Sequence, residues 1–359
     1  MISFVWASKY PFMAGAGGSE NYTAGLIREL MKRGIPTRLI TIGFGKNDGR
    51  QDFPDIAFKS LRTKRQLSLL DDTLIFTTYP LSIKTRRQSY AIMHCPPYSC
   101  GEDDPLFKLH KINDKQLLAP SKFSAGLWED HLSLERGSIP VIYPFADSSF
   151  GTTDRPWRSG HKVKLLFTSR LHPDKGVYTL LAALHLINKS SLNIQVTATT
   201  AGDHSEDGKV VRALLDAHPF VNVVPARRDA NAMAQLMSRH DVVVMPSTDI
   251  FWKEFFGMVS VEAQHAGCRV VASNSGGLPE TDCGNLMLVK PDNPKALADG
   301  IVQAAKLGPV TASERMRAST RFTVQATADT LLATINQTAM LPQKPALRSA
   351  VEPLLNQLS

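Results

Sequence analysis

Two glutamates lie on either side of an expected helix start in the second half of the chain. The stretch reads Glu254-Phe255-Phe256-Gly257-Met258-Val259-Ser260-Val261-Glu262. The first N–H groups of a helix have no intrahelical partner, and with the helix dipole they attract anions. We therefore expect the amides of Phe256 to Met258 to bind a diphosphate, with Glu254 accepting from sugar hydroxyls and Glu262 from ribose hydroxyls. The alternative is an amphipathic helix with two solvated glutamates.

Two basic residues follow the first apolar run of the second half. They belong to Ser169-Arg170-Leu171-His172-Pro173-Asp174-Lys175-Gly176, directly after residues 163–168. Open α/β sheets bind ligands at the carboxyl ends of their strands. Cations placed there neutralise the charge that develops on a leaving diphosphate. Arg170 and Lys175 are candidates for this role; an ordinary surface Arg and a Lys at a helix start are the alternative.

A glycine-rich loop and a histidine are the candidates in the first half. Gly17 and Gly18 join the first apolar run to a helix, where small residues let backbone amides approach an anion. The loop has neither P-loop nor dinucleotide-fingerprint spacing, so a structural turn is the alternative. His94 follows another β-rich run and precedes two prolines, a place where loops carry function. A packed histidine is the alternative there.

The elements that position these residues alternate between β-rich runs and helix-periodic segments, which predicts an α/β fold with parallel sheets covered by helices. The expected strands are residues 2–7, 37–42, 73–77, 90–93, 116–119 and 138–142, then 163–168, 194–199, 221–224, 242–245, 270–272 and 286–289.

The length of 359 residues favours two domains, because single cores stop growing below this size. A Pro- and Gly-containing stretch, residues 144–162, suits a linker. We expect an N-terminal domain over 1–150 and a C-terminal domain over 151–335. The Pro-interrupted tail, 336–359, is expected to cross back onto the first domain.

Composition indicates the cellular compartment and the kind of binding partner. A hydrophobic fraction of 43% and a charged fraction of 21% indicate a folded globular protein. The four cysteines are too scattered for a disulfide framework, and no run reaches membrane-spanning length, which favours the cytoplasm. The net charge of +8 suits anionic partners. We expect the basic residues to form solvated faces, and contact of these faces with the inner face of the membrane or with the acceptor is the alternative. The basic clusters have no interleaved aromatic residues, which disfavours nucleic acid as a partner.

Taken in order, these motifs resemble the retaining GT-B glycosyltransferases of family 4 (glycosyl transferases group 1). The resemblance includes Pro246-Ser247 before Glu254 and Ser275-Gly276-Gly277-Leu278-Pro279-Glu280 after the next expected strand, and it covers essentially the whole chain. It implies two Rossmann-like domains that face each other across a cleft, an N-terminal acceptor domain and a C-terminal nucleotide-sugar donor domain. The loop Thr248 to Lys253, with Phe251 and Trp252, is bulkier than the family's usual one; its aromatics line a subsite or merely pack.

The resemblance assigns a role to each candidate. Arg170 and Lys175 hold the donor diphosphate, and Glu254 holds sugar hydroxyls. The backbone of Phe256, Gly257 and Met258 contacts sugar and phosphate, and Glu262 contacts the ribose. Gly17 and Gly18 lie at the donor phosphate or sugar, His94 reaches the donor sugar near the reacting centre, and Arg227, after residues 221–224, lies near the base.

The expected reaction moves a hexose-type sugar from a UDP- or GDP-sugar to a saccharide, lipid-linked or small-molecule acceptor, as in polysaccharide biosynthesis. The chain has no Asp-x-Asp tripeptide, so we expect no metal and no cofactor. No pair of glycosidase-type carboxylates is apparent. A GT-B epimerase or phosphorylase is the alternative, and a non-enzymatic nucleotide- or nucleic-acid-binding protein is a more distant one.

Overall fold

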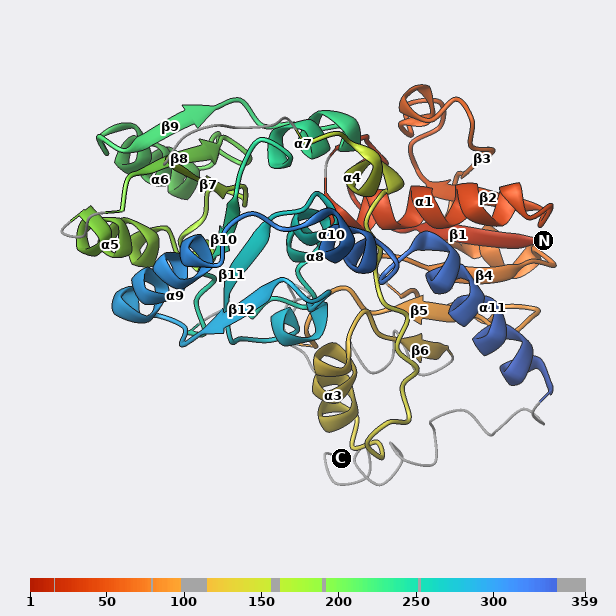
Figure 1. The fold of residues 1–359 in the computed structure, drawn as a ribbon. Helices are drawn as coiled ribbons and strands as arrows, with labels where there is room; N and C mark the ends of the chain where they lie inside the picture. The colour runs from red at the N-terminus through yellow and green to blue at the C-terminus, as the bar shows by residue number, and fades with distance from the viewer. Residues whose placement is uncertain are drawn as a thin grey trace, which may run out of the picture. The chain divides into compact units, whose positions relative to one another are not determined.

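Contacts between residues divide the computed structural model into two units (Figure 1). Unit 1 comprises residues 1–144 and the segment from Val324 onward, and unit 2 comprises residues 145–323. The structure describes residues 1–15, 17–78, 80–97, 115–155, 162–188, 192–250 and 253–340.

These divisions differ from the expected boundaries near residues 150 and 335. Residues 145–150 belong to unit 2, since Asp147 caps the short helix α4 (Ser148–Thr152), which contacts other helices of that unit. Residues 324–335 belong to unit 1, because they form a helix that packs on it. Of the expected tail, 341–359 lies outside the described residues.

Unit 1 is built on a parallel sheet with the strand order β3-β2-β1-β4-β5-β6. Every residue of the inner strand β1 is buried, as expected for a strand covered on both faces. The elements are β1 (Ile2–Trp6), α1 (Gly18–Lys32), β2 (Thr37–Ile42), η1 (Arg50–Asp52), β3 (Phe58–Leu61), η2 (Lys64–Leu69), β4 (Thr73–Phe76), β5 (Tyr90–Ile92), β6 (Gln116–Leu118), α3 (Lys122–His131) and α11 (Val324–Met340).

Helices α1 and α11 of unit 1 pack against each other. Helix α1 ends shortly before Gly34, which takes a positive φ of 75° that glycine adopts without cost. The Arg33 guanidinium donates to the Asp329 carboxylate, and the Thr327 hydroxyl donates to the Tyr143 carbonyl at 2.9 Å. These contacts attach the last described helix to the first unit.

Two strand predictions in unit 1 were wrong. The edge strand β3 was not expected, because four residues with two polar side chains give a weak β signal. Residues 138–142 were expected as a strand but make only a bridge between Ala119 and Val141. Pro140 explains the difference: it accepts from the Ala119 N–H at 2.9 Å but has no N–H of its own to extend the ladder.

Unit 2 repeats the architecture, with the strand order β12-β11-β10-β7-β8-β9. Its elements, besides α4, are β7 (Val163–Phe167), η3 (Pro173–Lys175), α5 (Val177–Asn188), β8 (Ile194–Thr199), α6 (Glu206–Asp216), β9 (Val221–Val224), α7 (Ala230–Met237), β10 (Val242–Met245), α8 (Met258–His265), β11 (Arg269–Ser273), η4 (Leu278–Thr281), β12 (Leu286–Val289), α9 (Pro294–Lys306) and α10 (Ala312–Ser319).

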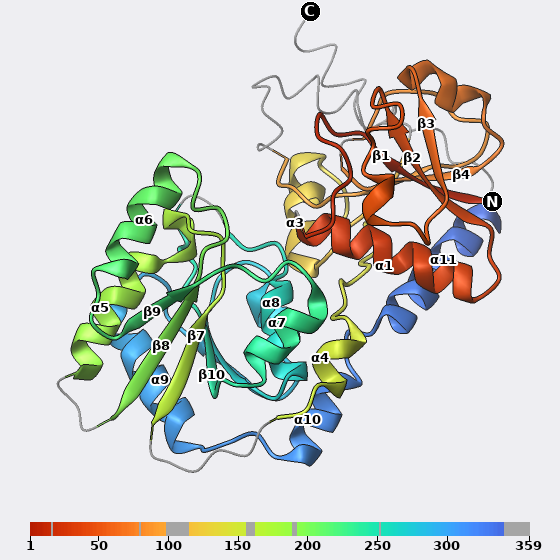
Figure 2. The same ribbon diagram turned by 90° about the horizontal axis from the view of Figure 1, so that it is seen from above.

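Helices cover both faces of the unit 2 sheet. Helices α5, α6 and α9 lie together on one face (Figure 2), where their apolar residues and those of the strands form one buried cluster. Helices α7 and α8 contact each other, and α8 packs on β10 and β11. The sheet is therefore held rigid between two helical layers, which fixes the loops at its carboxyl edge.

Candidate functional site

The motif loops of unit 2 meet at one edge of its sheet. Strand β10 pairs in parallel with β7 on one side and with β11 on the other. The loops after these three strands therefore lie side by side at the carboxyl edge, the usual ligand side of an open α/β sheet. They carry Arg170 and Lys175, then Pro246 to Gly257, and then Ser275 to Leu278.

An ion pair joins two of these loops. Lys175 Nζ lies 2.6 Å from Glu254 Oε1, and both side chains are largely buried, at 10% and 17% exposure. The Ser247 hydroxyl donates to the same oxygen at 3.2 Å. Oε1 therefore has two donors, while no described residue donates to Oε2, which is left as an acceptor for a ligand hydroxyl. Sequence reasoning did not assign a role to Ser247.

The glycines of the Ser275 to Leu278 turn allow it to approach Glu254 closely. Gly276 has a positive φ of 58°, and a Cβ built on it would lie 2.2 Å from the Glu254 carbonyl oxygen. The Gly277 N–H donates to that same oxygen at 2.7 Å. A larger residue at position 276 would push the turn away from Glu254, so the turn holds the backbone of the candidate sugar-binding glutamate.

The start of α8 presents unpaired backbone donors. Gly257 precedes the helix with a positive φ of 96°, and no side chain caps it. No described residue accepts a hydrogen bond from the N–H groups of Gly257, Met258 or Val259. These donors and the helix dipole make the start of α8 suited to an anion, close in sequence to Glu254.

Phe256, expected to offer its amide, has a buried side chain in contact with Phe322. The two ring centroids are 5.3 Å apart in an edge-on arrangement. This ring anchors the segment before α8, so its side chain has a packing function whatever its backbone binds.

Glu262 lies farther along α8 and is partly buried. Burial, and to a smaller extent the nearby Asp147 carboxylate, raise the pKa of Glu262 to about 7. Its carboxyl group makes no hydrogen bond or ion pair with any residue that the structure describes. A carboxylate with a raised pKa and open acceptors is suited to a ligand that brings its own donors.

Arg170 and Arg227 are exposed and have no ion-pair partner in the described part of the chain. Arg170 follows β7 in the same loop as Lys175, whereas Arg227 follows β9, the strand at the edge of the sheet. Strand β8 separates β9 from β7. Arg227 therefore comes from the flank of the site rather than from its centre.

The candidates of unit 1 lie at the carboxyl edge of its own sheet. Gly17 precedes α1 in an extended conformation, and Gly18 is its first residue. His94 follows β5, and its ring meets the Tyr22 ring of α1 at 5.2 Å. Burial lowers the pKa of His94 to about 4, and its Nε2 is buried with no hydrogen-bond partner. His94 is therefore neutral at physiological pH, and Tyr22 brings it near the start of α1.

A second contact network tethers the bulky loop before Glu254. The Ser275 hydroxyl donates to Asp249 Oδ1 at 2.5 Å, and the Lys253 ammonium lies 3.1 Å from the same oxygen. These two donors, Ser275 first, keep the pKa of Asp249 below its usual value. The expected aromatic contributors, Phe251 and Trp252, lie outside the described residues.

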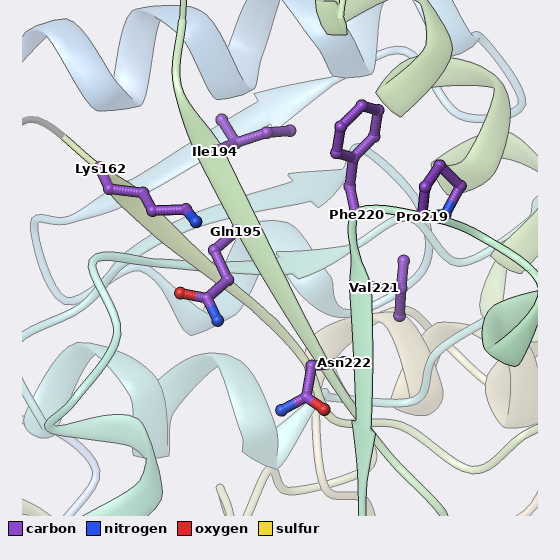
Figure 3. Close-up of a pocket in the computed structure, with 7 residues that line it drawn as sticks. All are labelled: Lys162, Ile194, Gln195, Pro219, Phe220, Val221 and Asn222. Carbon is purple, nitrogen blue, oxygen red and sulfur yellow. The ribbon is translucent and has the colours of Figure 1, made fainter.

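A shallow pocket lies at the opposite edge of the sheet. Figure 3 shows Ile194 and Val221, the first residues of β8 and β9, with Lys162, Gln195, Pro219, Phe220 and Asn222 around them. No motif residue lines this pocket. It is therefore separate from the candidate site.

The described part of the chain has neither a metal-binding cluster nor a membrane-spanning helix. No group of three or more His, Cys, Asp or Glu side chains there is arranged to hold a metal ion. No helix there is long and apolar enough to cross a membrane.

The two parallel α/β units define the fold class as that of GT-B glycosyltransferases. A glycosyltransferase from Rickettsia africae aligns with a TM-score of 0.71 at 16% identity, over 95% of this chain and 99% of that one. The structure of Anabaena HepE in complex with UDP aligns with a TM-score of 0.70 at 19% identity, over 94% and 99%. At such identities the likeness concerns the fold.

Most of the second unit matches a known protein family. Residues 162–306 match the family Glycosyl transferases group 1. The Salmonella typhimurium lipopolysaccharide 1,2-N-acetylglucosaminetransferase is 27% identical over 47% of this chain and 46% of its own length. The Segniliparus rotundus D-inositol 3-phosphate glycosyltransferase is 31% identical over 61% and 51%. The chain thus spans about half the length of these curated relatives.

Proposed function

We propose that the chain is a retaining glycosyltransferase of family 4 that transfers a hexose-type sugar from a UDP- or GDP-sugar. The acceptor is a saccharide, a lipid-linked sugar or a small molecule, and the reaction needs no metal. The observation that carries the proposal is the Lys175–Glu254 ion pair on neighbouring loops that also present the free amides of α8. One arrangement thus offers a cation, a carboxylate oxygen and backbone donors to a single ligand.

Each group has a defined task in this proposal. Lys175, Arg170 and the α8 amides stabilise the negative charge of the diphosphate as it leaves. Glu254 Oε2 accepts a hydrogen bond from a hydroxyl of the sugar and so fixes its orientation. A UDP complex and a UDP-glucose complex of Anabaena HepE, which has the same fold, support a nucleotide-sugar donor.

We propose that transfer proceeds on one face of the sugar. The bond from the anomeric carbon to the donor phosphate oxygen breaks, the acceptor oxygen bonds to that carbon on the same face, and the leaving phosphate takes the acceptor proton. The protein orients the reactants and stabilises charge. Gly17, Gly18 and His94 keep their predicted roles at the donor, and Arg227 keeps its predicted role at the base.

The direct test measures release of UDP or GDP from a panel of nucleotide sugars, with and without mixed lipid and saccharide acceptors and with a chelator present. We expect one donor to be consumed faster when acceptor is added, with the anomeric configuration of the donor kept in the product. Chelator-sensitive turnover that magnesium or manganese restores would contradict metal independence. If the donor is converted at the same rate with and without acceptor, the enzyme is an epimerase instead. If turnover requires inorganic phosphate, it is a phosphorylase.

The raised pKa of Glu262 predicts a pH-dependent donor affinity. The ionised carboxylate is the better acceptor for ribose hydroxyls, so affinity for the nucleotide sugar should rise several-fold as the pH increases from 6 to 8, through a pKa of about 7. The donor diphosphate is a diester and does not titrate in this window. Glu262→Gln should bind more weakly, with a flatter pH profile, in calorimetry. If the donor affinity of both proteins changes with pH in the same way, the assignment of Glu262 to the ribose is wrong.

Thermal unfolding supplies the control for Glu262. Because folding raises this pKa from 4.5, the folded state disfavours the ionised form, and the penalty grows as the pH rises from about 4.5 to about 7. Glu262→Gln should therefore be more stable than the wild type at pH 8 and closer to it at pH 5. A variant that is less stable at pH 8 would show that the carboxylate has a structural partner.

A further inference from the structure

Two chain segments of unit 1 cover the same face of its sheet. One runs from β3 through η2 to β4, and the other runs from β4 to β5. Leu67 of the first belongs to the buried cluster on this face, and Leu81 and Ile83 of the second pack against it. Two hydrogen bonds of 3.0 Å from Arg87 to Asp71 join the segments directly. Their outer sides therefore form one continuous surface.

This surface carries an excess of positive charge. The first segment contributes three exposed cations and the second two, and none has an ion-pair partner in the described part of the chain; they are Arg62, Lys64, Arg65, Lys84 and Arg86. Lys59 of the edge strand β3 is half-buried and lies on the same side of the sheet, because residues two apart in a strand face the same side and Leu61 belongs to the same cluster.

The acidic residues of this region do not neutralise the surface. Between Ile56 and Ser89 they are Asp71 and Asp72. Asp71 accepts two hydrogen bonds from Arg87, and Asp72 is held by the Ser3 hydroxyl and the Arg38 guanidinium. Both carboxylates are thus already paired, and the cations remain available to an external anion.

A leucine lies within the charged surface. Leu69, in η2, has 65% of its surface exposed, although Leu67 of the same short helix is fully buried. An exposed apolar side chain among cations is suited to an anionic lipid surface, where the leucine enters the headgroup region. Single-stranded nucleic acid would instead need aromatic rings for stacking. The described aromatics here do not offer them: Phe76 is buried, and Phe58 packs near Phe12 and Phe53.

We propose that the surface formed by Lys59, Arg62, Lys64, Arg65, Leu69, Lys84 and Arg86 is a docking site for membranes that contain anionic lipids. This goes beyond the proposed sugar transfer, and its test does not use turnover. Each cation near an anionic surface contributes roughly a fivefold gain in binding. The binding is electrostatic in its main part and so must weaken with salt.

The test is cosedimentation of the full chain with vesicles of phosphatidylcholine, with or without phosphatidylglycerol. We expect binding only to the anionic vesicles, and loss of binding at high salt. The substituted protein combines Arg62→Ala, Lys64→Ala and Arg65→Ala. It should bind at least about tenfold more weakly, with an unchanged melting temperature because these side chains are exposed.

A control protein loses the same charge elsewhere, at three exposed cations of unit 2: Lys290→Ala, Lys306→Ala and Arg317→Ala. It should bind vesicles like the wild type.

Leu69→Ser should weaken vesicle binding a few-fold without changing the salt dependence. Failure of the wild type to bind anionic vesicles, or equal losses in the two triple variants, would overturn the proposal. If the protein binds heparin or single-stranded DNA more tightly than vesicles, and Leu69→Ser has no effect, the ligand is a soluble polyanion and the proposed lipid docking is wrong.

Discussion

Glu254→Gln is expected to lower sugar-transfer turnover by at least about a hundredfold, with nucleotide affinity changed only a few-fold. Glutamine keeps the shape of the side chain but removes the charge that faces Lys175 Nζ at 2.6 Å. It also weakens the acceptor offered to a sugar hydroxyl. Steady-state release of UDP or GDP, together with calorimetric binding of the nucleotide, separates the two effects. Turnover within a few-fold of the wild type would remove Glu254 from the proposed site.

Lys175→Met replaces the ion-pair partner of Glu254 and provides a thermodynamic control for the Glu254→Gln prediction. Lys175→Met leaves the largely buried Glu254 carboxylate without its ammonium partner, and Glu254→Gln leaves the Lys175 ammonium with only the more distant Asp174 carboxylate, at 3.9 Å. Breaking a buried ion pair in this way commonly costs a few kcal/mol. The double variant removes both charges, so we expect it to recover much of the lost stability while turnover stays lost. If the stability losses simply add, the two residues are not coupled, and the ion pair does not describe the protein in solution.

An exposed ion pair provides the matched reference for this cycle. Lys209 Nζ and Glu206 Oε1 of α6 are also 2.6 Å apart, but their side chains are 59% and 90% exposed. Surface pairs contribute at most about 1 kcal/mol. Lys209→Met and Glu206→Gln should therefore leave both stability and turnover close to the wild type.

Gly176→Ala is expected to disrupt the site and to lower the stability of unit 2. Gly176 has a positive φ of 73°, and a Cβ built on it would lie 1.7 Å from the Pro246 carbonyl oxygen. Alanine therefore requires the loop that carries Ser247 to move, in addition to the cost of roughly 1 kcal/mol for the left-handed conformation. We expect a total loss of at least about 3 kcal/mol, measured as a shift in the unfolding midpoint, and a large loss of turnover.

Gly308→Ala separates the two contributions. Gly308 has a nearly identical φ of 71°, but nothing lies within 4 Å of the added Cβ. This variant should show only the conformational cost of about 1 kcal/mol and wild-type turnover. Similar stability losses in the two variants would mean that the close approach of Gly176 to Pro246 is not maintained in solution.

Local sequence signals predicted most strands but not the partners of each residue. Val242 to Met245 reads as a buried strand because all four side chains are apolar, and the structure has it as β10. Residues 58–61 and 138–142 were mispredicted because pairing at a sheet edge depends on neighbours, and Pro140 removes a donor that periodicity does not register.

In the candidate site, too, the sequence singled out residues but not their partners. Sequence order and resemblance singled out Lys175 and Glu254 separately, but the two are 79 positions apart and meet only through sheet order. Ser247 had no chemical signature, since one serine after a proline is common in loops. The exposed positions of Arg170 and Arg227 give no indication of contact without a ligand, so their roles stay predictions.

Helix α11 has a consequence for the order in which the protein is made. Ala328 and Leu331 of α11 are fully buried, and the helix packs on α1, near the start of the chain. A ribosome finishes every residue of unit 2 at Thr323 but must continue to Met340 before α11 is complete. Domains generally fold from the N-terminus during synthesis. Here unit 1 is begun first but completed last, so α1 has no α11 to pack against until unit 2 has been translated.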